Sequence, residues 1–211
     1  METPFTIDDF FKVFGDYNSS VFPVQFTFIL FGIIAVILLH KKKQISSYFI
    51  TGLLGALWLW MGIVYHIYFF SSINKAAYAF GGLFIIQGLL FIIYAFQKKL
   101  NFSIENTSSG IIGYIFILFG LIIYPLIGYS LGGSIEKTIS LGLPCPTTIF
   151  TFGLFMLTTN KFPKHLLIIP TIWAIIGTSA AINFEVYQDY FMLIAAVTAN
   201  IYLIQRKSRH H

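Results

Sequence analysis

Hydrophobic residues along this chain gather into seven long blocks, and polar residues, glycine and proline fill the short gaps between the blocks. A helix needs about 20 apolar residues to cross the hydrocarbon core of a bilayer, and runs of that length are typical of transmembrane helices. The pattern therefore predicts a bundle of seven membrane-spanning helices. They cover residues of about 20–40, 47–70, 76–97, 110–131, 144–160, 164–182 and 187–205.

Residues 5–17 show a different pattern, in which apolar and acidic positions lie on opposite sides of a helix. Thr6 and Asp9 have the spacing of a capping box at the start of that helix. The apolar face is formed by Ile7, Phe10, Phe11 and Phe14. A helix with such an apolar face is typical of the membrane interface. We therefore expect a short interfacial amphipathic helix ahead of the first span.

Composition places the whole chain in the membrane class. Of its 211 residues, 57% are hydrophobic and 10% are charged, and the mean hydropathy is +0.81. Soluble domains carry about 25% charged residues. Seven spans use up the length, so we expect residues 1–211 to form a single integral-membrane domain. The single cysteine excludes a disulfide within the chain.

Basic residues are concentrated in the gaps that follow the odd-numbered spans, as the positive-inside rule requires of cytoplasmic loops. This bias predicts an N-terminus outside and a C-terminus inside. The ten inner residues are Lys41, Lys42, Lys43, Lys98, Lys99, Lys161, Lys164, Arg206, Lys207 and Arg209, against Lys12, Lys75 and Lys137 outside. Because topology accounts for the basic residues, we expect the lipid bilayer as partner and no nucleic acid. Assembly into a homo-oligomer is left open.

The stretch from Leu57 to Asn74 holds His66, the only ionisable side chain well inside a long apolar segment. Gly55, Gly62 and His66 are spaced by seven and four residues, which puts them on one helix face. Glycines in membrane helices mark faces where another helix approaches, so we expect His66 to point into the bundle. An ionisable group inside a membrane is a candidate for function. The alternative is a buried neutral histidine that is hydrogen-bonded to a neighbouring hydroxyl.

Further polar residues follow helical stripes or lie near the outer ends of the predicted spans. Together with His66 they predict a polar ligand pocket that opens to the outside of the membrane. The candidate pocket residues are Gln25, His66, Asn74, Gln87, Cys145, Thr147, Thr148, Thr151 and Asp189. A structural role is the alternative for each of them, because helical threonines bond to backbone carbonyls four residues earlier and glutamine amides join neighbouring helices.

Other site chemistries find little support in the residue spacing. His66, Cys145 and Asp189 have the side chains of metal ligands, and a metal site is kept as a weak alternative, although no CxxC, HxxxH or ExxH spacing supports it. The chain has no GxSxG or HExxH motif and no paired carboxylates, and we expect no cofactor. The last span, 187–205, has no lysine for a retinal Schiff base.

Four short motifs stand out along the chain. They are Asp16-Tyr17-Asn18 ahead of Val21-Phe22-Pro23-Val24-Gln25, then Tyr65-His66-x3-Phe70, Ile73-Asn74-x-Ala76-Ala77, and the run from Pro144 to Thr151 that contains Cys-Pro-Thr-Thr. Through these motifs most of the chain resembles an uncharacterised bacterial family of multi-pass integral-membrane proteins, known only as a domain of unknown function. The resemblance implies a protein of the bacterial inner (plasma) membrane and brings no substrate or reaction.

Three classes of function fit these patterns. The leading one is binding or transport of a small, uncharged or weakly charged solute through the outward-facing pocket. The first alternative is a membrane sensor or assembly partner whose polar residues only hold helices together. The second is a membrane-embedded enzyme, which would need titratable groups within reach of each other. A transporter also needs a polar path to the inner face, for which Thr158, Thr159 and Asn200 are the candidates.

Overall fold

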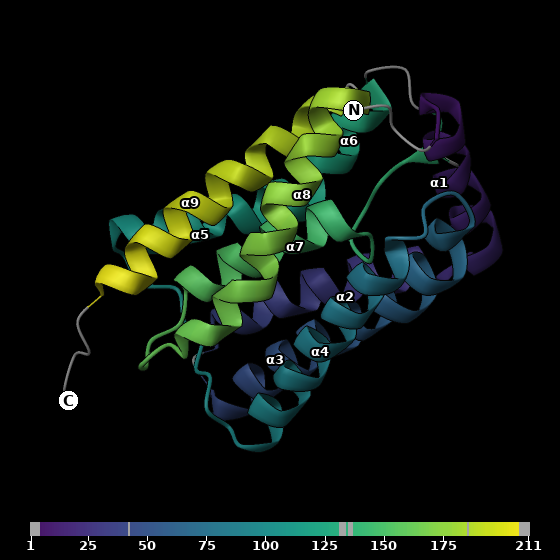
Figure 1. The fold of residues 1–211 in the computed structure, drawn as a ribbon. Helices are drawn as coiled ribbons and strands as arrows, with labels where there is room; N and C mark the ends of the chain where they lie inside the picture. Colours follow the sequence, from purple (N-terminus) through teal and green to yellow (C-terminus); the bar gives the residue numbers. More distant parts are fainter. Residues whose placement is uncertain (1–4, 42, 131–133, 135–136, 185, 207–211) are drawn as a thin grey trace.

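The chain folds into a helical bundle. The computed structural model describes residues 5–41, 43–130, 134, 137–184 and 186–206, and the regular secondary structure within these ranges is entirely helical. This confirms the predicted all-α class. In Figure 1, α2, α3 and α4 run side by side in one layer, α5, α8 and α9 form a second layer, and α7 lies between them. The bounds are α2 Val24–Leu39, α3 Gln44–Trp60, α4 Ala77–Phe96, α5 Ser108–Leu118, α7 Pro144–Met156, α8 Ile168–Phe184 and α9 Tyr190–Gln205.

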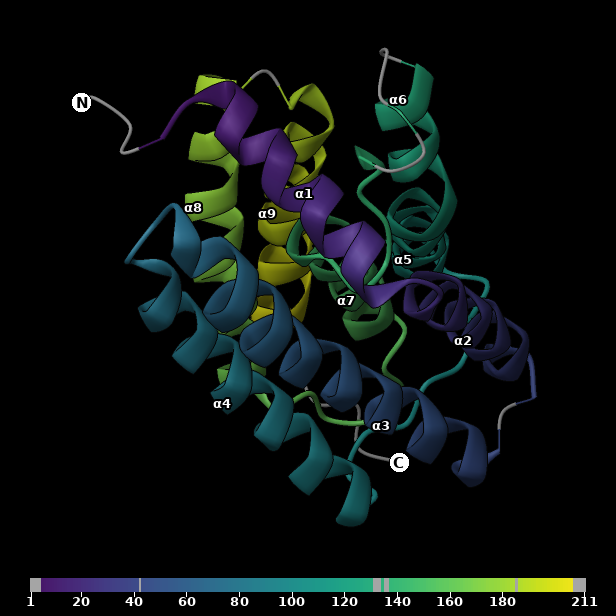
Figure 2. The same cartoon turned by 90° about the vertical axis from the view of Figure 1, so that its right-hand side faces the viewer.

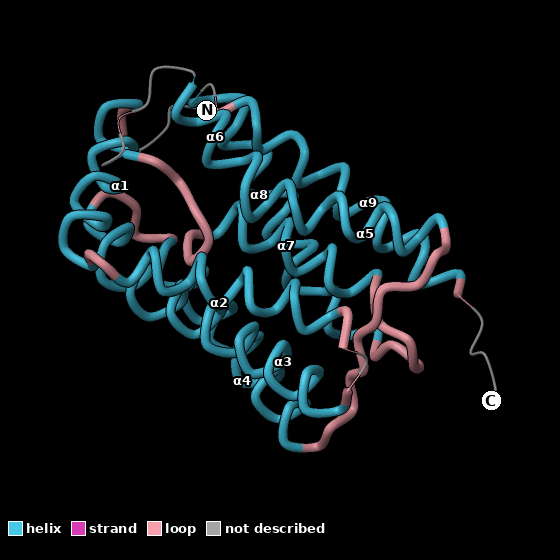
Figure 3. Tube along the Cα trace, turned by 180° about the vertical axis from the view of Figure 1, so that it is seen from behind, coloured by secondary structure: helices cyan, strands magenta, loops and turns pink. Residues whose placement is uncertain are grey.

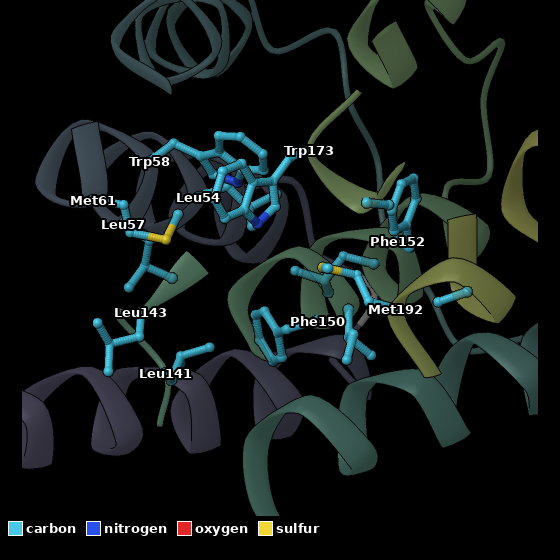
Figure 4. Close-up of a cluster of buried hydrophobic side chains, with 14 of the residues drawn as sticks. Leu54, Leu57, Trp58, Met61, Leu141, Leu143, Phe150, Phe152, Trp173 and Met192 are labelled. Carbon is cyan, nitrogen blue, oxygen red and sulfur yellow. The ribbon is translucent and has the colours of Figure 1, made fainter. Parts of the chain in front are cut away.

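Helix α7 occupies the centre of the bundle. Every residue of this 13-residue helix except Cys145 is buried, and it packs against α5, α8 and α9. Figure 4 shows the region where side chains of the two layers meet around α7. The labelled side chains are Leu54, Leu57 and Trp58 from α3, Met61 from the turn that continues α3, Phe150 and Phe152 from α7, Trp173 from α8, Met192 from α9, and Leu141 and Leu143 from the segment that precedes α7.

The chain enters α7 through a buried, non-helical segment, residues 138–143. Figure 3 shows this loop in pink, running from the end of the bundle near α1 to the start of α7. Three side chains pair with its backbone. Asn18 donates to the carbonyl of Thr138 (2.9 Å), Tyr17 donates to the carbonyl of Gly142 (3.3 Å), and the Gly142 N–H donates to the Thr147 hydroxyl (2.9 Å). Gly142 has a φ of +99°, a backbone conformation that favours glycine.

The number of helices that qualify as membrane spans is smaller than the predicted seven. Four described helices are long and apolar enough to cross a membrane, and a fifth is added if α1 and α2, bent by 85° relative to each other, count as one span. The four cover Gln44–Ser72, Ala77–Phe96, Ser108–Ser130 and Lys164–Phe184. These helices fit a membrane protein, as do the large apolar side chains exposed on the outside of the bundle, among them Phe26, Ile86, Ile175 and Ile201.

Short helices account for the difference in span count. The helices α2 and α9 have 16 residues each, and α7 has 13 in place of the helix predicted over 144–160. A helix of 13 residues is about 20 Å long, and the hydrocarbon core of a bilayer is about 30 Å thick. The apolar run that predicted a fifth span is therefore a short helix that other helices surround.

Glycines bring α3 and α4 into close contact, as the spacing of Gly55 and Gly62 predicted. A Cβ atom on Gly62 would lie 2.9 Å from the carbonyl oxygen of Gly81, and a Cβ atom on Gly88 would lie 2.8 Å from the backbone nitrogen of Leu59. Side chains larger than hydrogen at these positions would force the two backbones apart. Helix α3 continues without a break into a π-helical segment, η1 (Met61–Phe69), and then a 3-10 turn, η2 (Phe70–Ser72).

Helix α1 (Ile7–Val21) lies obliquely across one end of the bundle (Figure 2). The predicted capping box is present, because the Thr6 hydroxyl accepts from the Asp9 N–H (3.1 Å) and the Asp9 carboxylate accepts from the Thr6 N–H (3.0 Å). The helix predicted for residues 5–17 therefore exists, but it continues to Val21. Its buried side covers other helices of the protein through Phe10, Val13, Phe14, Tyr17 and Asn18.

Two neighbouring glycines of α4 allow the effect of close packing on stability to be measured apart from the effect of helix propensity. A Cβ at Gly81 would lie 2.6 Å from Ile67 Cγ1 and 2.9 Å from the carbonyl oxygen of Gly62, whereas a Cβ at Gly82 has nothing within 4 Å. We expect Gly81→Ala to lower the free energy of unfolding by about 1–3 kcal/mol. Gly82→Ala should leave it unchanged or raise it by up to about 1 kcal/mol. Thermal unfolding in detergent micelles measures both, and equal effects would contradict the close contact between α4 and η1.

Candidate functional site

A cavity of about 190 Å³ lies beneath α1 and is called the aromatic cavity below. Its walls come from η1, η2, α4, α7, α8 and the short η6 turn (Tyr187–Asp189) ahead of α9. Phe10 and Phe14 of α1 cover it, and the facing rings are Tyr65, Phe70, Phe80, Trp173 and Phe184. The polar side chains that line it are Asn74, Cys145, Ser179, Asn183 and Asp189. A cavity of about 150 Å³ holds benzene, so this one has room for a small organic group.

Asp189 is the buried carboxylate of the aromatic cavity. It is 2% exposed and occupies the N-cap position of α9, where aspartate ordinarily accepts a hydrogen bond from its own helix. Asp189 makes no such bond. Its Oδ1 accepts instead from the hydroxyl of Tyr124, a buried residue of α6 (Tyr124–Ser130), and the Cys145 thiol lies beside it. Among the described residues, the groups that interact with this carboxylate are neutral ones.

Cys145 is the residue of α7 that keeps some exposed surface, and it lines the aromatic cavity. The two residues that flank it are Pro144 and Pro146, which have no backbone N–H. The next N–H along the helix, that of Thr147, donates to the carbonyl of Leu143 (3.3 Å). Free N–H groups make helix N-termini attractive to anions. Here those donors are largely missing or already paired, so the start of α7 is poorly suited to bind an anion.

Stacked rings hold α1 over the aromatic cavity. Phe10 stacks on Phe184 with 4.7 Å between ring centroids, and Phe14 stacks on Tyr65 with 5.7 Å between centroids. The interplanar angles are 21° and 9°. Such offset-stacked pairs add stability beyond the area that they bury. They join α1 to α8 and to η1, so α1 acts as the cover of the cavity.

His66 lies behind the wall of the aromatic cavity. It is fully buried, and neither ring nitrogen has a hydrogen-bond partner among the described residues. Its ring packs edge-on against Phe84 (4.6 Å between centroids) and against Trp173 (5.0 Å). The prediction that His66 points into the bundle agrees with this position. The structure does not place it among the residues that line the cavity, because the Trp173 ring lines the cavity and contacts His66 from that side.

The threonines of α7 do not line the aromatic cavity. Those with partners form hydrogen bonds to the backbone and to α3. Thr151 donates to the carbonyl of Thr147 (2.7 Å) and accepts from the indole N–H of Trp58 (3.1 Å). This is the structural alternative that the sequence left open, and for Thr151 it is confirmed. Thr147 accepts from Gly142, as described above, and the Thr148 hydroxyl is buried without a partner among the described residues.

The two candidate glutamines also lie elsewhere. Gln25 lines a second cavity of about 630 Å³ between the α1–α2 bend and α6, and its amide donates to the carbonyl of Asn18 (2.5 Å). Gln87 is fully buried, and its amide donates to the carbonyl of Leu166 (3.3 Å), which joins α4 to the turn ahead of α8. Both therefore connect helices.

Three of the nine candidate residues do come together. Asn74, Cys145 and Asp189 line the aromatic cavity, whereas Gln25, His66, Gln87, Thr147, Thr148 and Thr151 do not. Asn74 also accepts from the N–H of Ala76 (3.0 Å) at the start of α4. In the described part of the chain, no three His, Cys, Asp or Glu side chains are grouped to hold a metal ion. His66, Cys145 and Asp189 in particular are not grouped in this way, because His66 does not line the cavity and packs against the Trp173 ring.

Sequence reasoning missed the aromatic wall and the partner of Asp189. Tyr124 and Trp173 lie within long apolar runs, where their rings look like ordinary core residues. The available signal was their polar tip, because a buried tyrosine or tryptophan usually needs a hydrogen-bond partner. The Tyr124 hydroxyl bonds to Asp189, and the Trp173 indole N–H has the Cys145 thiol as its polar neighbour.

Replacement of His66 by phenylalanine tests its packing role. A buried polar group without a partner costs about 1–3 kcal/mol, and an apolar group of similar shape removes that cost. We therefore expect His66→Phe to raise the free energy of unfolding, by up to about 2 kcal/mol, as measured by thermal unfolding in detergent. His66→Ala, which leaves a cavity between the same rings, should lower it. A destabilised His66→Phe protein would indicate a polar partner for the imidazole.

Comparisons with known proteins complete the description of the site. Neither a curated protein nor a solved structure matches the chain. The profile of DUF6064, a family of unknown function, matches residues 7–211 and so includes every helix described above. This agrees with the resemblance to an uncharacterised family that the sequence motifs indicated. With nearly its whole length matched, the chain belongs to the family of unknown function DUF6064.

Proposed function

We propose that this protein lies in the bacterial inner membrane and binds a small solute in the aromatic cavity, on the outer side. The observation that carries the proposal is the cavity itself, in which a half-buried cysteine and a buried aspartate interrupt an aromatic wall. Pockets for small molecules are typically apolar, with a few polar groups that fix the orientation of the ligand. Cys145 and Asp189 are suited to that role.

The non-helical segment ahead of α7 supports a solute site within the membrane. Non-helical backbone inside a membrane is tolerated where protein buries it or where it lines a cavity, and many transporters build their sites from interrupted helices. Residues 138–143 are of this kind. Ile139 and Pro144, near the two ends of the segment, both line the aromatic cavity.

The distribution of charge supports an arrangement of seven crossing segments with the N-terminus outside and the C-terminus inside. In this arrangement residues 138–156 make one crossing, and α2 and α9 make two others. The described basic residues of the end opposite α1 are Lys41, Lys43, Lys98, Lys99, Lys161, Lys164 and Arg206. Contacts join the loops of that end, since Arg206 donates to the carbonyls of Thr158 (2.5 Å) and Thr159 (2.9 Å). Cytoplasmic loops carry such an excess of basic residues.

Binding alone is better supported than passage through the protein. Two of the polar side chains expected along an inner path bond within the protein instead, Thr158 to the carbonyl of Phe155 (2.7 Å) and Asn200 to the Thr171 hydroxyl (2.7 Å). The buried length of α7 lies between the aromatic cavity and that end. Transport would therefore require a second arrangement of α7. A membrane sensor needs only the binding site, which makes it the second candidate.

Reporter fusions test the proposed topology. A reporter joined after Asn74 is expected to be active outside the cytoplasm, and one joined after Lys99 is expected to be active in the cytoplasm. The reason is the positive-inside bias of the loops. Finding both reporters on the same side of the membrane would contradict the crossing of α4, and the reverse pattern would contradict the orientation.

Access to Cys145 tests the binding site and its cover. Cys145 is the only thiol of the chain, so a small neutral reagent such as methyl methanethiosulfonate reports on it alone. We expect slow modification in the solubilised protein and faster modification in Phe10→Ala, because Phe10 stacks between α1 and Phe184 over the cavity. Ile7→Ala, on the same helix but 43% exposed, is the matched control and should leave the rate unchanged. A Cys145 that stays unreactive in folded wild-type and Phe10→Ala protein would contradict a solute-accessible site.

A further inference from the structure

We propose that the solute is a small organic cation, with an alkylated ammonium head held between the Asp189 carboxylate and the aromatic rings. This inference rests on the proposed function and names the class of solute for the same site. It departs from the uncharged or weakly charged solute that the sequence indicated. Four observations carry it, and they concern charge, ring chemistry, the helix terminus and size.

The first observation is a buried carboxylate without a cationic partner. Asp189 is 2% exposed, and its neighbours Tyr124 and Cys145 are neutral donors. A buried carboxyl group without a cationic partner is neutral when it carries a proton, and its charged form needs a partner. A neutral solute or an anion would therefore leave Asp189 protonated or uncompensated. A cationic solute in the aromatic cavity would supply the missing member of the pair.

The second observation is the chemistry of the wall. The cavity is lined by Tyr65, Phe70, Phe80, Trp173 and Phe184, and Trp173 stands edge-on to Phe80 (5.6 Å between centroids). Aromatic rings attract cations through their negative faces, and cages of such rings recognise quaternary ammonium groups. Among the same rings only Tyr65 carries an oxygen atom, whereas a hydrated inorganic cation needs several oxygen ligands. An organic cation fits this wall better than a metal ion.

The third observation concerns the α7 N-terminus and the donor groups that face the cavity. Pro144 and Pro146 remove N–H groups that would otherwise favour an anion. The indole N–H of Trp173, which is buried at 7% exposure and lines the cavity, has the Cys145 thiol beside it and makes no closer hydrogen bond among the described residues. An oxygen atom carried by the same solute would be a stronger acceptor for this N–H than the thiol sulfur. An ammonium head with a hydroxyl or carbonyl group nearby would use both ends of the site.

The fourth observation is size. The cavity of about 190 Å³ is slightly larger than one of about 150 Å³ that holds benzene. A tetraalkylammonium ion with methyl groups falls in this range. Ser179 and Asn183, both exposed and both among the lining residues, mark the rim through which such an ion would enter.

Charged thiol reagents test the proposal on the solubilised full-length protein, because Cys145 lies beside Asp189. Trimethylammonioethyl, sulfonatoethyl and methyl methanethiosulfonate carry a positive, a negative and no charge. Each forms a disulfide with the Cys145 thiolate and releases methanesulfinate. The rate of each reagent with Cys145 is divided by its rate with 2-mercaptoethanol in solution. This removes the intrinsic differences in reactivity among the reagents. We expect the normalised rate of the cation to exceed that of the anion by about tenfold or more, since a carboxylate lies nearby.

Three variants identify the source of the preference. Asp189→Asn should abolish it. The neutral reagent should still react, at the wild-type rate or faster, because loss of the carboxylate favours the Cys145 thiolate. Tyr124→Phe removes the hydroxyl that bonds to Asp189 but keeps the carboxylate, so the preference should remain. Asp16→Asn makes the same change of charge at an exposed site of α1 and should have no effect. A preference that survives Asp189→Asn would overturn the role of this carboxylate.

Protection of Cys145 gives a second readout that needs no variant. Tetramethylammonium and tert-butanol have the same number of heavy atoms and differ in charge. We expect tetramethylammonium to slow modification by the neutral reagent and tert-butanol to have little effect at equal concentration. Equal protection, or a normalised preference for the anion, would overturn the cationic class but leave the proposed binding site standing. No reaction of Cys145 with the neutral reagent would overturn the proposed function itself.

Discussion

The pairing of the buried backbone ahead of α7 is the constraint on which the rest of the structure depends. Buried N–H and C=O groups that belong to no helix must find other partners. Tyr17 and Asn18 supply two of these partners from α1, so α1 has to lie across this end of the bundle. Gly142 allows the turn that the segment makes before α7 begins. The aromatic cavity exists because α1, held in this way, covers the space above Cys145 and Asp189.

The sequence predicted local features well because they depend on neighbouring residues. The capping box of Thr6 and Asp9 and the glycine face of α3 follow from spacing along one helix. The length and placement of α7 could not be predicted in this way. An apolar run looks the same whether lipid or other helices surround it, and only the packed structure shows that α7 is enclosed on all sides.

The candidate site was predicted only in part, for a related reason. Of the polar residues in apolar runs, Cys145 and Asp189 line the aromatic cavity, whereas His66, the leading candidate from the sequence, packs among aromatic rings. Asp189 stands at a position where local rules predict an N-cap, and its side chain turns to Tyr124 on another helix instead. The rings that form the wall come from segments far apart in the chain, and their meeting is a tertiary event that no spacing records.

The cover of the cavity also has a consequence for the order of biosynthesis. Chains are made from the N-terminus, so α1 emerges before the other helices. One of its stacking partners, Phe184, and the carboxylate of Asp189 are made only after α2, α3, α4, α5 and α7. Until α8 is inserted, Phe10 lacks that partner and part of the apolar face of α1 stays uncovered. The aromatic cavity can therefore close only late in synthesis, after α8 has been made.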